Sequence, residues 1–219
     1  MSAQLAHVYW LGGGTGAGKS TIAHRLANRF GLRLYDTDRA MSDHTTRSSP
    51  QETPYLQEFL AMNMDERWAN RSPEVMLDTF HWFRGEAFDL IVDDLLRLAP
   101  EPVIVEGFRL LPDLVAPLLA DRRQAAWLLP TPGFQRAAFE HRGSLWSIAG
   151  QTSNPERALG NLLERDRMFT DRIAGETERL GLTGLSVNVG LTTDELTEQV
   201  TDLFGLDHPT DRSGVPKNG

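Results

Sequence analysis

The chain has 219 residues, of which 22 are Lys or Arg and 30 are Asp or Glu, so its formal net charge is -8. An acidic chain does not offer the general basic surface that binds nucleic acid, where Lys and Arg neutralise phosphates. It contains no cysteine, which excludes disulfides and thiolate metal sites, and its 40% of hydrophobic residues suffices for the core of one globular domain.

We expect neither a secretory signal nor a membrane span. Residues 1–12 carry no basic segment, and the apolar run at 5–11 is short and interrupted by His7. Elsewhere no stretch approaches the roughly 20 apolar residues that cross a bilayer. The prediction is a cytoplasmic protein with no membrane partner and no nucleic-acid partner.

The first predicted unit is a strand followed by a glycine-rich loop and a helix. Residues 5–11 are rich in strand-forming side chains and lead into glycines at 12–14, which favour a tight loop. Residues 20–30 then repeat apolar side chains every fourth position, and Gly31 follows where a helix C-cap belongs. A second strand is predicted at residues 32–35.

The sequence predicts a loop followed by helices in the middle of the chain. Residues 41–54 are dominated by Ser, Thr, Asp, Pro and Gln, so we expect a mobile loop there. Helix starts are predicted at the N-cap residues Ser72 and Thr192 and at the beginning of the long segment 154–181. Apolar residues at helical spacing predict a further helix at 88–96.

Three further apolar runs, at residues 103–105, 125–129 and 185–187, complete the predicted strands. Because segments of helical crossover length separate the strands, the sheet should be parallel and covered on both faces. The sequence therefore predicts an α/β fold, with residues 1–206 as a single domain and 207–219 as a polar, disordered tail.

Residues 13–20 fit the Walker A or P-loop motif, G-x-x-x-x-G-K-[ST], between a predicted strand and a predicted helix. Glycines let backbone N–H groups curl around a phosphate, and the helix N-terminus adds partial positive charge. The Lys19 ammonium would reach the β- and γ-phosphates, and the Ser20 hydroxyl would ligate Mg²⁺. We predict that ATP with Mg²⁺ is bound by Gly13, Gly14, Thr15, Gly16, Ala17, Gly18, Lys19, Ser20 and Thr21.

Two carboxylates, Asp36 and Asp38, follow the second predicted strand, at the sheet edge where the glycine loop also lies. By themselves they also suit a helix N-terminus. With this D-T-D segment the chain resembles the P-loop small-molecule kinases of the nucleoside monophosphate kinase superfamily, and among them the shikimate kinases. The resemblance implies that Asp36 holds the water shell of Mg²⁺ and that Asp38 accepts the proton of an acceptor hydroxyl.

The predicted strand at 103–105 leads into Glu106, and Arg109 follows three residues later. The segment E-G-F-R is similar to the D-G-F-P-R of adenylate kinases, with Glu in place of Asp and no proline. By this similarity Glu106 is a candidate Mg²⁺ ligand and Arg109 a candidate substrate contact. The alternative is a local ion pair between the two side chains.

Arginines of the long predicted helix form the last set of candidates. The resemblance implies that a lid-like segment, residues 141–157, and the helix after it supply arginines that cover the transferring phosphoryl group. Arg165 is the candidate catalytic arginine, and Arg167 and Arg172 are candidate substrate contacts. Arginines on a long helix are otherwise solvated surface residues.

Residues 39–100 would form a helical region on the acceptor side. Trp68, His81 and Trp82 lie in it and could line a pocket, although tryptophans at helical spacing are more often core residues. The region matches no substrate signature, so an antibiotic, a nucleoside, a sugar and a vitamin precursor all remain open as the small-molecule acceptor.

Taken together, the resemblance implies a three-layer P-loop NTPase fold with a five-stranded parallel sheet in the order 2-3-1-4-5 and a helical lid. We predict a kinase that transfers the γ-phosphoryl group of Mg·ATP to a hydroxyl of a small molecule. One alternative is a nucleoside monophosphate kinase, which the D-T-D pair disfavours because it would repel an anionic acceptor. The other is a non-catalytic nucleotide-dependent switch or ATPase.

Overall fold

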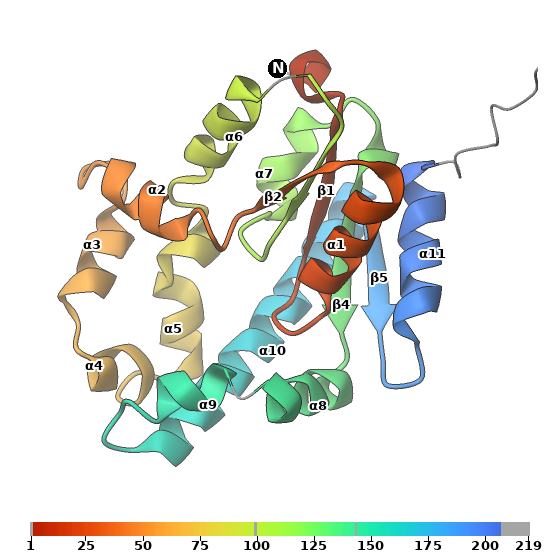
Figure 1. Ribbon diagram of the computed structural model, residues 1–219. Coiled ribbons are helices and arrows are strands. Elements are labelled where there is room, and N and C mark those ends of the chain that lie inside the picture. The colour runs from red at the N-terminus through yellow and green to blue at the C-terminus, as the bar shows by residue number, and fades with distance from the viewer. Residues whose placement is uncertain (1, 99, 143, 207–219) are drawn as a thin grey trace, which may run out of the picture.

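A computed structural model describes residues 2–98, 100–142 and 144–206, without the side chains of residues 139–146. Part of the predicted lid-like segment and the predicted tail at 207–219 therefore lie outside the described residues. The strands form one parallel sheet in the order β2-β3-β1-β4-β5, which confirms the predicted order (Figure 1). They are β1 (Val8–Gly13), β2 (Arg33–Asp36), β3 (Val103–Glu106), β4 (Ala125–Pro130) and β5 (Thr183–Val187).

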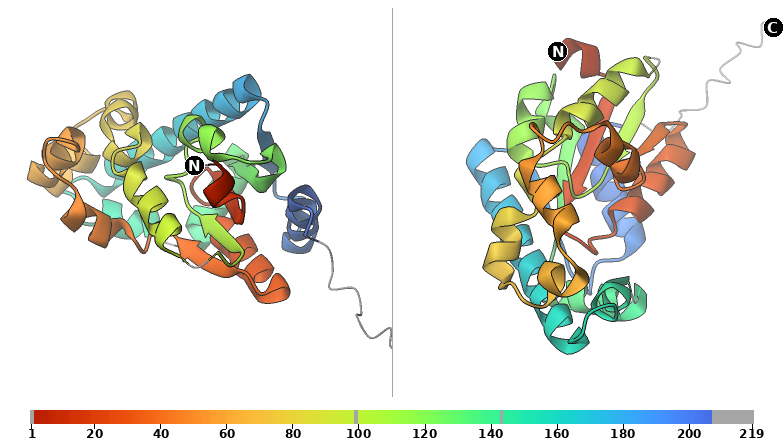
Figure 2. Two further views of the ribbon diagram at one scale, coloured as in Figure 1. Left: turned by 90° about the horizontal axis from the view of Figure 1, so that it is seen from above. Right: turned by 90° about the vertical axis from the view of Figure 1, so that its left-hand side faces the viewer.

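Helices surround this sheet and extend beyond its β2 side. The α-helices are α1 (Lys19–Phe30), α2 (Met41–Arg47), α3 (Pro54–Ala61), α4 (Met64–Trp68), α5 (Pro73–Thr79), α6 (Phe88–Arg97), α7 (Pro112–Val115), α8 (Pro132–Arg142), α9 (Ser144–Ala149), α10 (Pro155–Leu180) and α11 (Thr193–Phe204). Short 3₁₀ helices span Ser2–Leu5, His81–Arg84, Ala116–Leu118 and Arg122–Gln124. Figure 2 shows that α2 to α5 lie to one side of the sheet, where α4 and α5 pack against α10. Within the described residues, no helix combines the length and the apolar character needed to cross a membrane.

Alternate strand residues face opposite sides of the sheet and supply two cores. Trp10, Val105 and Trp127 pack toward α6, α7 and α10, and all three side chains are buried. Their neighbours Leu11, Ile104 and Ala126 pack toward α1 and α11. The sheet is therefore the middle of three layers, as the α/β prediction requires.

Helix ends lie where the sequence signals placed them. Gly31 ends α1 in the left-handed conformation with φ of 66°, and its N–H donates to the Ala27 carbonyl. The Asn154 side chain accepts from the Arg157 N–H at the start of α10, and Thr192 and Glu195 form the predicted capping box of α11. These predicted boundaries are confirmed.

The prediction of a mobile loop at residues 41–54 is wrong, because the segment contains α2. Within this helix the Thr45 hydroxyl donates to the Met41 carbonyl, and Arg47 pairs with Asp43 at 2.8 Å. His44 is fully buried and holds the helix against α6. The sequence pattern gave no sign of this helix, because its buried residue is a histidine and it has no apolar stripe.

At Gly13 and Gly14 the glycine loop packs closely against β4 and α10. A Cβ atom at Gly13 would overlap the backbone of Leu128 in β4, and one at Gly14 would overlap the Thr170 hydroxyl of α10. Gly13 also has φ of 122°, a conformation that side chains disfavour. The Gly14 N–H donates to the Leu128 carbonyl at 2.9 Å, so the loop is tied to β4.

We predict that Gly13→Ala lowers the free energy of unfolding by about 3 kcal/mol, because overpacking adds to backbone strain. Urea denaturation monitored by circular dichroism measures this loss. The matched control is Gly175→Ala, in the exposed middle of α10 with open space around its Cβ position. It should stabilise the chain by roughly 0.5–1 kcal/mol, since alanine is the better helix former. Equal stability of the two variants would contradict the packing argument.

Candidate functional site

The glycine loop joins the end of β1 to the start of α1. Gly18 precedes the helix in the left-handed conformation, with φ of 85°, and Lys19 is its first residue. The Lys19 ammonium is buried and donates to the Gly14 carbonyl at 2.8 Å, so its charge is held inside the loop. A helix N-terminus and a buried ammonium together favour an anion at this position.

Two of the predicted carboxylates lie side by side at the carboxyl edge of the sheet. Asp36 and Glu106 are register partners at the ends of β2 and β3, and Glu106 is also level with Leu11 of β1. The Asp36 carboxylate accepts from the backbone N–H of Asp38 at 2.9 Å, which turns the chain so that Asp38 follows at the edge. The structure therefore brings Asp36, Asp38 and Glu106 to one place beside Lys19.

The surroundings change the basicity of two of these carboxylates. Burial raises the pKa of Glu106, against the hydrogen bond from Ser20 and the charge of Lys19. Desolvation also raises the pKa of Asp38, and again Lys19 opposes it. Asp38 is exposed to solvent, but it lines a pocket whose neighbouring atoms remove part of the water around its carboxylate. A raised pKa makes Asp38 the better proton acceptor.

Asp38 and the glycine loop share a pocket that we call the aromatic pocket. It has a volume of about 350 Å³ and joins Thr15 of the loop to Asp38, Trp82, Phe108 and Arg165. Trp68 and His81 also line it, and both side chains are buried. These two residues are therefore core residues and pocket residues at once. Phe59, Phe80 and Phe83 complete its aromatic wall.

Arg165 is the only arginine that lines the aromatic pocket within the described chain. Its side chain is 7% exposed, and its Nε and Nη2 atoms donate to one carboxylate oxygen of Asp166 at 2.8 and 2.6 Å. The guanidinium lies over the rings of Trp68, Phe80 and Phe83 at 5.1 to 5.3 Å from their centroids. Its third nitrogen, Nη1, has no hydrogen-bond partner in the described part of the chain.

The other two candidate arginines of α10 lie elsewhere. Arg167 pairs with Glu164 at 2.7 Å and with Asp171 at 2.5 Å, both on its own helix, and lines a different pocket beside α8. Arg172 pairs with Glu176 at 2.8 Å and is partly exposed. The structure does not bring either side chain to the aromatic pocket.

Arg109 is buried behind the pocket wall, not in the pocket. Its Nη1 lies 2.9 Å from His44 Nδ1, its Nη2 donates to the Ala87 carbonyl at 3.1 Å, and its guanidinium lies 4.0 Å from the ring centroid of Trp82. Burial lowers the pKa of Arg109 to about 10, which still leaves the group charged near neutral pH. Arg109 therefore does not line the pocket as the predicted substrate contact would, and in the described chain it does not form the alternative ion pair with Glu106. It ties β3 to α2 and supports Trp82.

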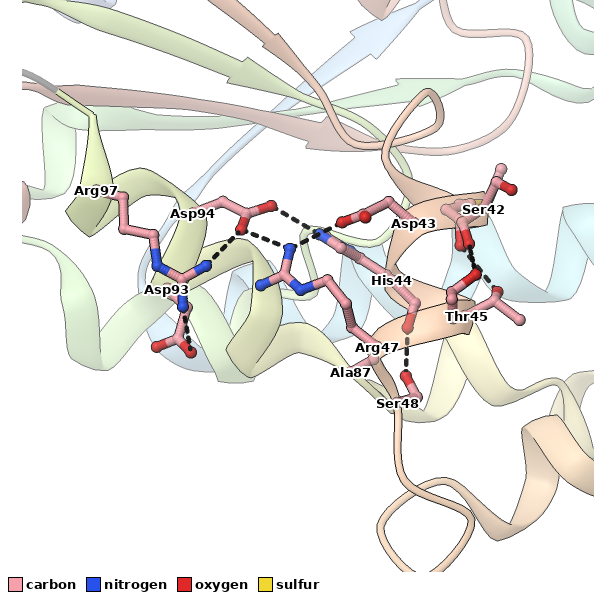
Figure 3. A network of polar contacts seen from close by, with 12 residues as sticks. Ser42, Asp43, His44, Thr45, Arg47, Ser48, Ala87, Asp93, Asp94 and Arg97 are labelled. Carbon is pink, nitrogen blue, oxygen red and sulfur yellow. Dashed lines mark hydrogen bonds and ion pairs between the residues drawn. The ribbon is translucent and has the colours of Figure 1, made fainter.

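A polar network joins α2 to α6 through His44, Arg47 and Asp94 (Figure 3), and Arg109 contacts it at His44. His44 Nε2 lies 2.9 Å from Asp94, which also accepts from Tyr35 at 2.7 Å and from Arg47 at 2.8 Å. Burial alone would raise the pKa of Asp94, but these hydrogen bonds lower it to about 2. Asp94 is therefore an ionised anchor for α2.

The cluster of Asp43, His44 and Asp94 has ligand atoms close enough for a metal ion, but its hydrogen bonds use the histidine fully. A guanidinium only donates, so His44 Nδ1 accepts from Arg109. Nε2 then carries the proton and donates to Asp94, and no nitrogen lone pair remains for a metal. We read the cluster as a structural network that orients α2 and Arg109.

A second pocket lies on the other flank of the glycine loop, and we call it the α11 pocket. It has a volume of about 210 Å³ and is lined by Gly16, Gly18 and Thr21 together with Phe134 of α8 and Leu191 before α11. Sequence reasoning named Thr21 as an ATP-binding residue but singled out neither Phe134 nor Leu191. It also missed His44 and Asp94, which lie 50 residues apart in the chain and carry no motif.

We predict that His81 makes the protein less stable as the pH falls. Burial, with the charges of Arg109 and Arg67, lowers the pKa of His81 to about 3, so the folded chain excludes a proton that the unfolded chain binds below its pKa of about 6.5. The stabilisation is fully present above about pH 6.5, and it is lost as the pH falls toward 3. Between about pH 7.5 and about pH 5 the free energy of unfolding should fall by about 2 kcal/mol through His81.

Urea titrations of the wild type and of His81→Phe at both pH values measure this effect. The variant keeps an aromatic ring among Phe59, Phe80 and Trp82 and should lose most of this pH dependence. His24→Gln, on the exposed face of α1, is the control and should retain it. A wild-type pH dependence that persists in His81→Phe would show that other groups cause it.

Comparisons with known proteins give one partial family match. A search of curated proteins found no significant match. Among solved structures, the chain is similar to an uncharacterized protein from Eubacterium ventriosum, with 14% sequence identity and a TM-score of 0.48 over 90% of this chain and 97% of that one. The family model of shikimate kinase matches residues 15–54, the segment that holds most of the glycine loop, β2 and the D-T-D carboxylates. Over these residues the chain matches the shikimate kinase family, which is a family of P-loop kinases.

Proposed function

We propose that this protein is a phosphotransferase that moves the γ-phosphoryl group of Mg·ATP to a hydroxyl group of a small molecule. The observation that carries the proposal is the placement of Asp38 and Arg165 in one pocket with Thr15 of the glycine loop. The family match at residues 15–54 supports a kinase-like activity.

The two pockets suit the two substrates of such a transfer. The α11 pocket lies against Gly16 and Gly18 and has the apolar walls that suit a nucleobase. The aromatic pocket begins at Thr15 and contains Asp38, which suits an acceptor. Phosphates bound by the glycine loop would then lie between nucleoside and acceptor, which is the order that phosphoryl transfer requires.

In the proposed reaction Asp38 orients the acceptor hydroxyl and takes its proton as the oxygen attacks the γ-phosphorus. The new P–O bond forms while the bond to the β-phosphate oxygen breaks, and the developing charge there is neutralised by Lys19 and the backbone N–H groups of the glycine loop. The raised pKa of Asp38 favours this proton transfer.

The oxygen atoms of Ser20, Asp36 and Glu106 form a donor set that suits Mg²⁺, a hard cation that binds oxygen ligands. Glu106 is buried beside Asp36 and accepts a hydrogen bond from Ser20, so these residues present their oxygens at one edge of the sheet. Mg²⁺ supplies neutralisation of phosphate charge when it is bound.

The first test is ADP release from Mg·ATP with a panel of neutral hydroxyl compounds and a panel of nucleoside monophosphates. We predict turnover with a hydroxyl compound and a roughly 10²- to 10⁴-fold loss in Asp38→Asn, because the proton acceptor is removed. ATP binding, measured by calorimetry, should remain. Asp202→Asn, exposed on α11, is the matched control and should keep full activity.

Turnover only with nucleoside monophosphates, unaffected by Asp38→Asn, would contradict the hydroxyl-acceptor proposal. Tight nucleotide binding without turnover in either panel would indicate a nucleotide-dependent switch. A nucleoside monophosphate kinase would release ADP and a switch would not, so the same assay separates these two alternatives.

Arg165 and Arg167 allow a matched test on one helix. We predict that Arg165→Lys lowers kcat roughly 10²-fold, because a lysine cannot keep both bonds to Asp166, so the paired side chains lose their position beside the reacting groups. Arg167→Lys should change kcat less than twofold, since Arg167 pairs on its own helix. Steady-state kinetics at saturating ATP measures both. Equal losses in the two variants would contradict the proposed role of Arg165.

A further inference from the structure

We propose that the phosphoryl acceptor is an uncharged hydroxyl compound that carries a flat aromatic ring and a neutral polar group. The inference rests on the proposed function and names the substrate class of the aromatic pocket. Three properties of that pocket carry it: its ring-lined walls, the balance of its charges and its unpartnered polar atoms.

The walls of the pocket offer ring contacts on several sides. Trp82 and Phe108 line it, as do Phe80 and Phe83, and its volume of about 350 Å³ falls in the range of small-molecule sites. Phe108 is half-buried and stacks near Phe80, with 6.5 Å between ring centroids and 24° between planes. Flat apolar rings gain most from such walls, whereas a polyol would lose hydration there without equivalent hydrogen bonds.

The charges that line the pocket do not favour an anionic acceptor. Asp38 contributes a negative charge, and the positive charge of Arg165 is already matched by Asp166 through two hydrogen bonds to one carboxylate oxygen. Three further arginines are close by but do not line the pocket. Arg71 is near enough for its charge to act on Arg165, and it donates to the Thr79 hydroxyl and to the Arg67 carbonyl. Arg67 donates to backbone carbonyls of α3, and Arg109 lies against Trp82 and His44.

Three atoms of the pocket residues lack hydrogen-bond partners in the described part of the chain. They are Arg165 Nη1, which donates, Asp166 Oδ2, which accepts, and His81 Nδ1. Arg165 and Asp166 are more than nine-tenths buried, so each unpartnered atom is costly unless a bound group satisfies it. A neutral group with both a donor and an acceptor, such as a primary amide or a hydroxyl, matches this pair better than a carboxylate.

The proposal is tested with three compounds that share a primary alcohol. The first, 4-(hydroxymethyl)benzamide, has the flat ring and the neutral amide. The second, 4-(hydroxymethyl)benzoate, has the ring with a negative charge. The third, trans-4-(hydroxymethyl)cyclohexanecarboxamide, has the amide without a flat ring. Ligand-observed NMR titration of the full chain measures binding, and ADP release from Mg·ATP measures transfer.

We expect the benzamide to bind at least tenfold more tightly than the benzoate and about fivefold more tightly than the cyclohexane compound. Phe108→Leu, which keeps an apolar side chain but removes the ring, should weaken benzamide binding about fivefold. Phe30→Leu, the same substitution at the end of α1 away from the pocket, should not change it. ATP binding should be the same in both variants.

Tighter binding of the benzoate would overturn the uncharged acceptor, and equal binding of the cyclohexane compound would overturn the aromatic ring. Loss of benzamide binding in Phe30→Leu to the same extent as in Phe108→Leu would place the ligand outside the pocket and overturn the proposal. Selective benzamide binding with no ADP release from any acceptor in either panel would contradict the kinase function while supporting the ligand class of the pocket.

Discussion

The close approach of backbone at Gly13 and Gly14 to β4 and α10 is the constraint on which the site depends. Because these residues have no side chain, the glycine loop lies directly on the Leu128 backbone and on Thr170. That contact sets the position of Lys19 and of the first turn of α1 relative to the rest of the molecule. The parallel register of β2, β3 and β1 then places the carboxylates at the same edge.

A second set of contacts determines which chemistry surrounds that edge. His44 and Arg109 hold α2 against β3 and α6, and the charge of Arg109 supports Trp82 from behind the pocket. The aromatic wall is therefore held by buried, charge-assisted hydrogen bonds and not by apolar packing alone. Asp38 lies between this wall and the glycine loop, so it faces a low-polarity pocket on one side and Lys19 on the other.

The glycine loop and the helix caps were predictable because each depends on local sequence, whereas the order of the strands was predicted from the family resemblance. Gly31, Asn154 and Thr192 mark helix ends through contacts within three or four residues, and such signals survive without tertiary information. The helix α2 and the pocket depend on contacts between distant segments, which a single sequence does not encode in any local pattern. His44 meets an aspartate 50 residues away, and Arg165 is set apart from Arg167 only by how α10 packs.

The contact between Gly14 and Thr170 joins the glycine loop to the helix that carries Arg165 and Asp166. Under the proposed function, the arginine would then belong to the static frame of the molecule and not to a segment that folds over the substrate. Closure would not be needed to bring its side chain to the site. Shielding of the phosphoryl group from hydrolysis would fall to the acceptor itself, whose ring displaces water from the space beside Asp38, so wasteful ATP cleavage would be highest when the pocket is empty.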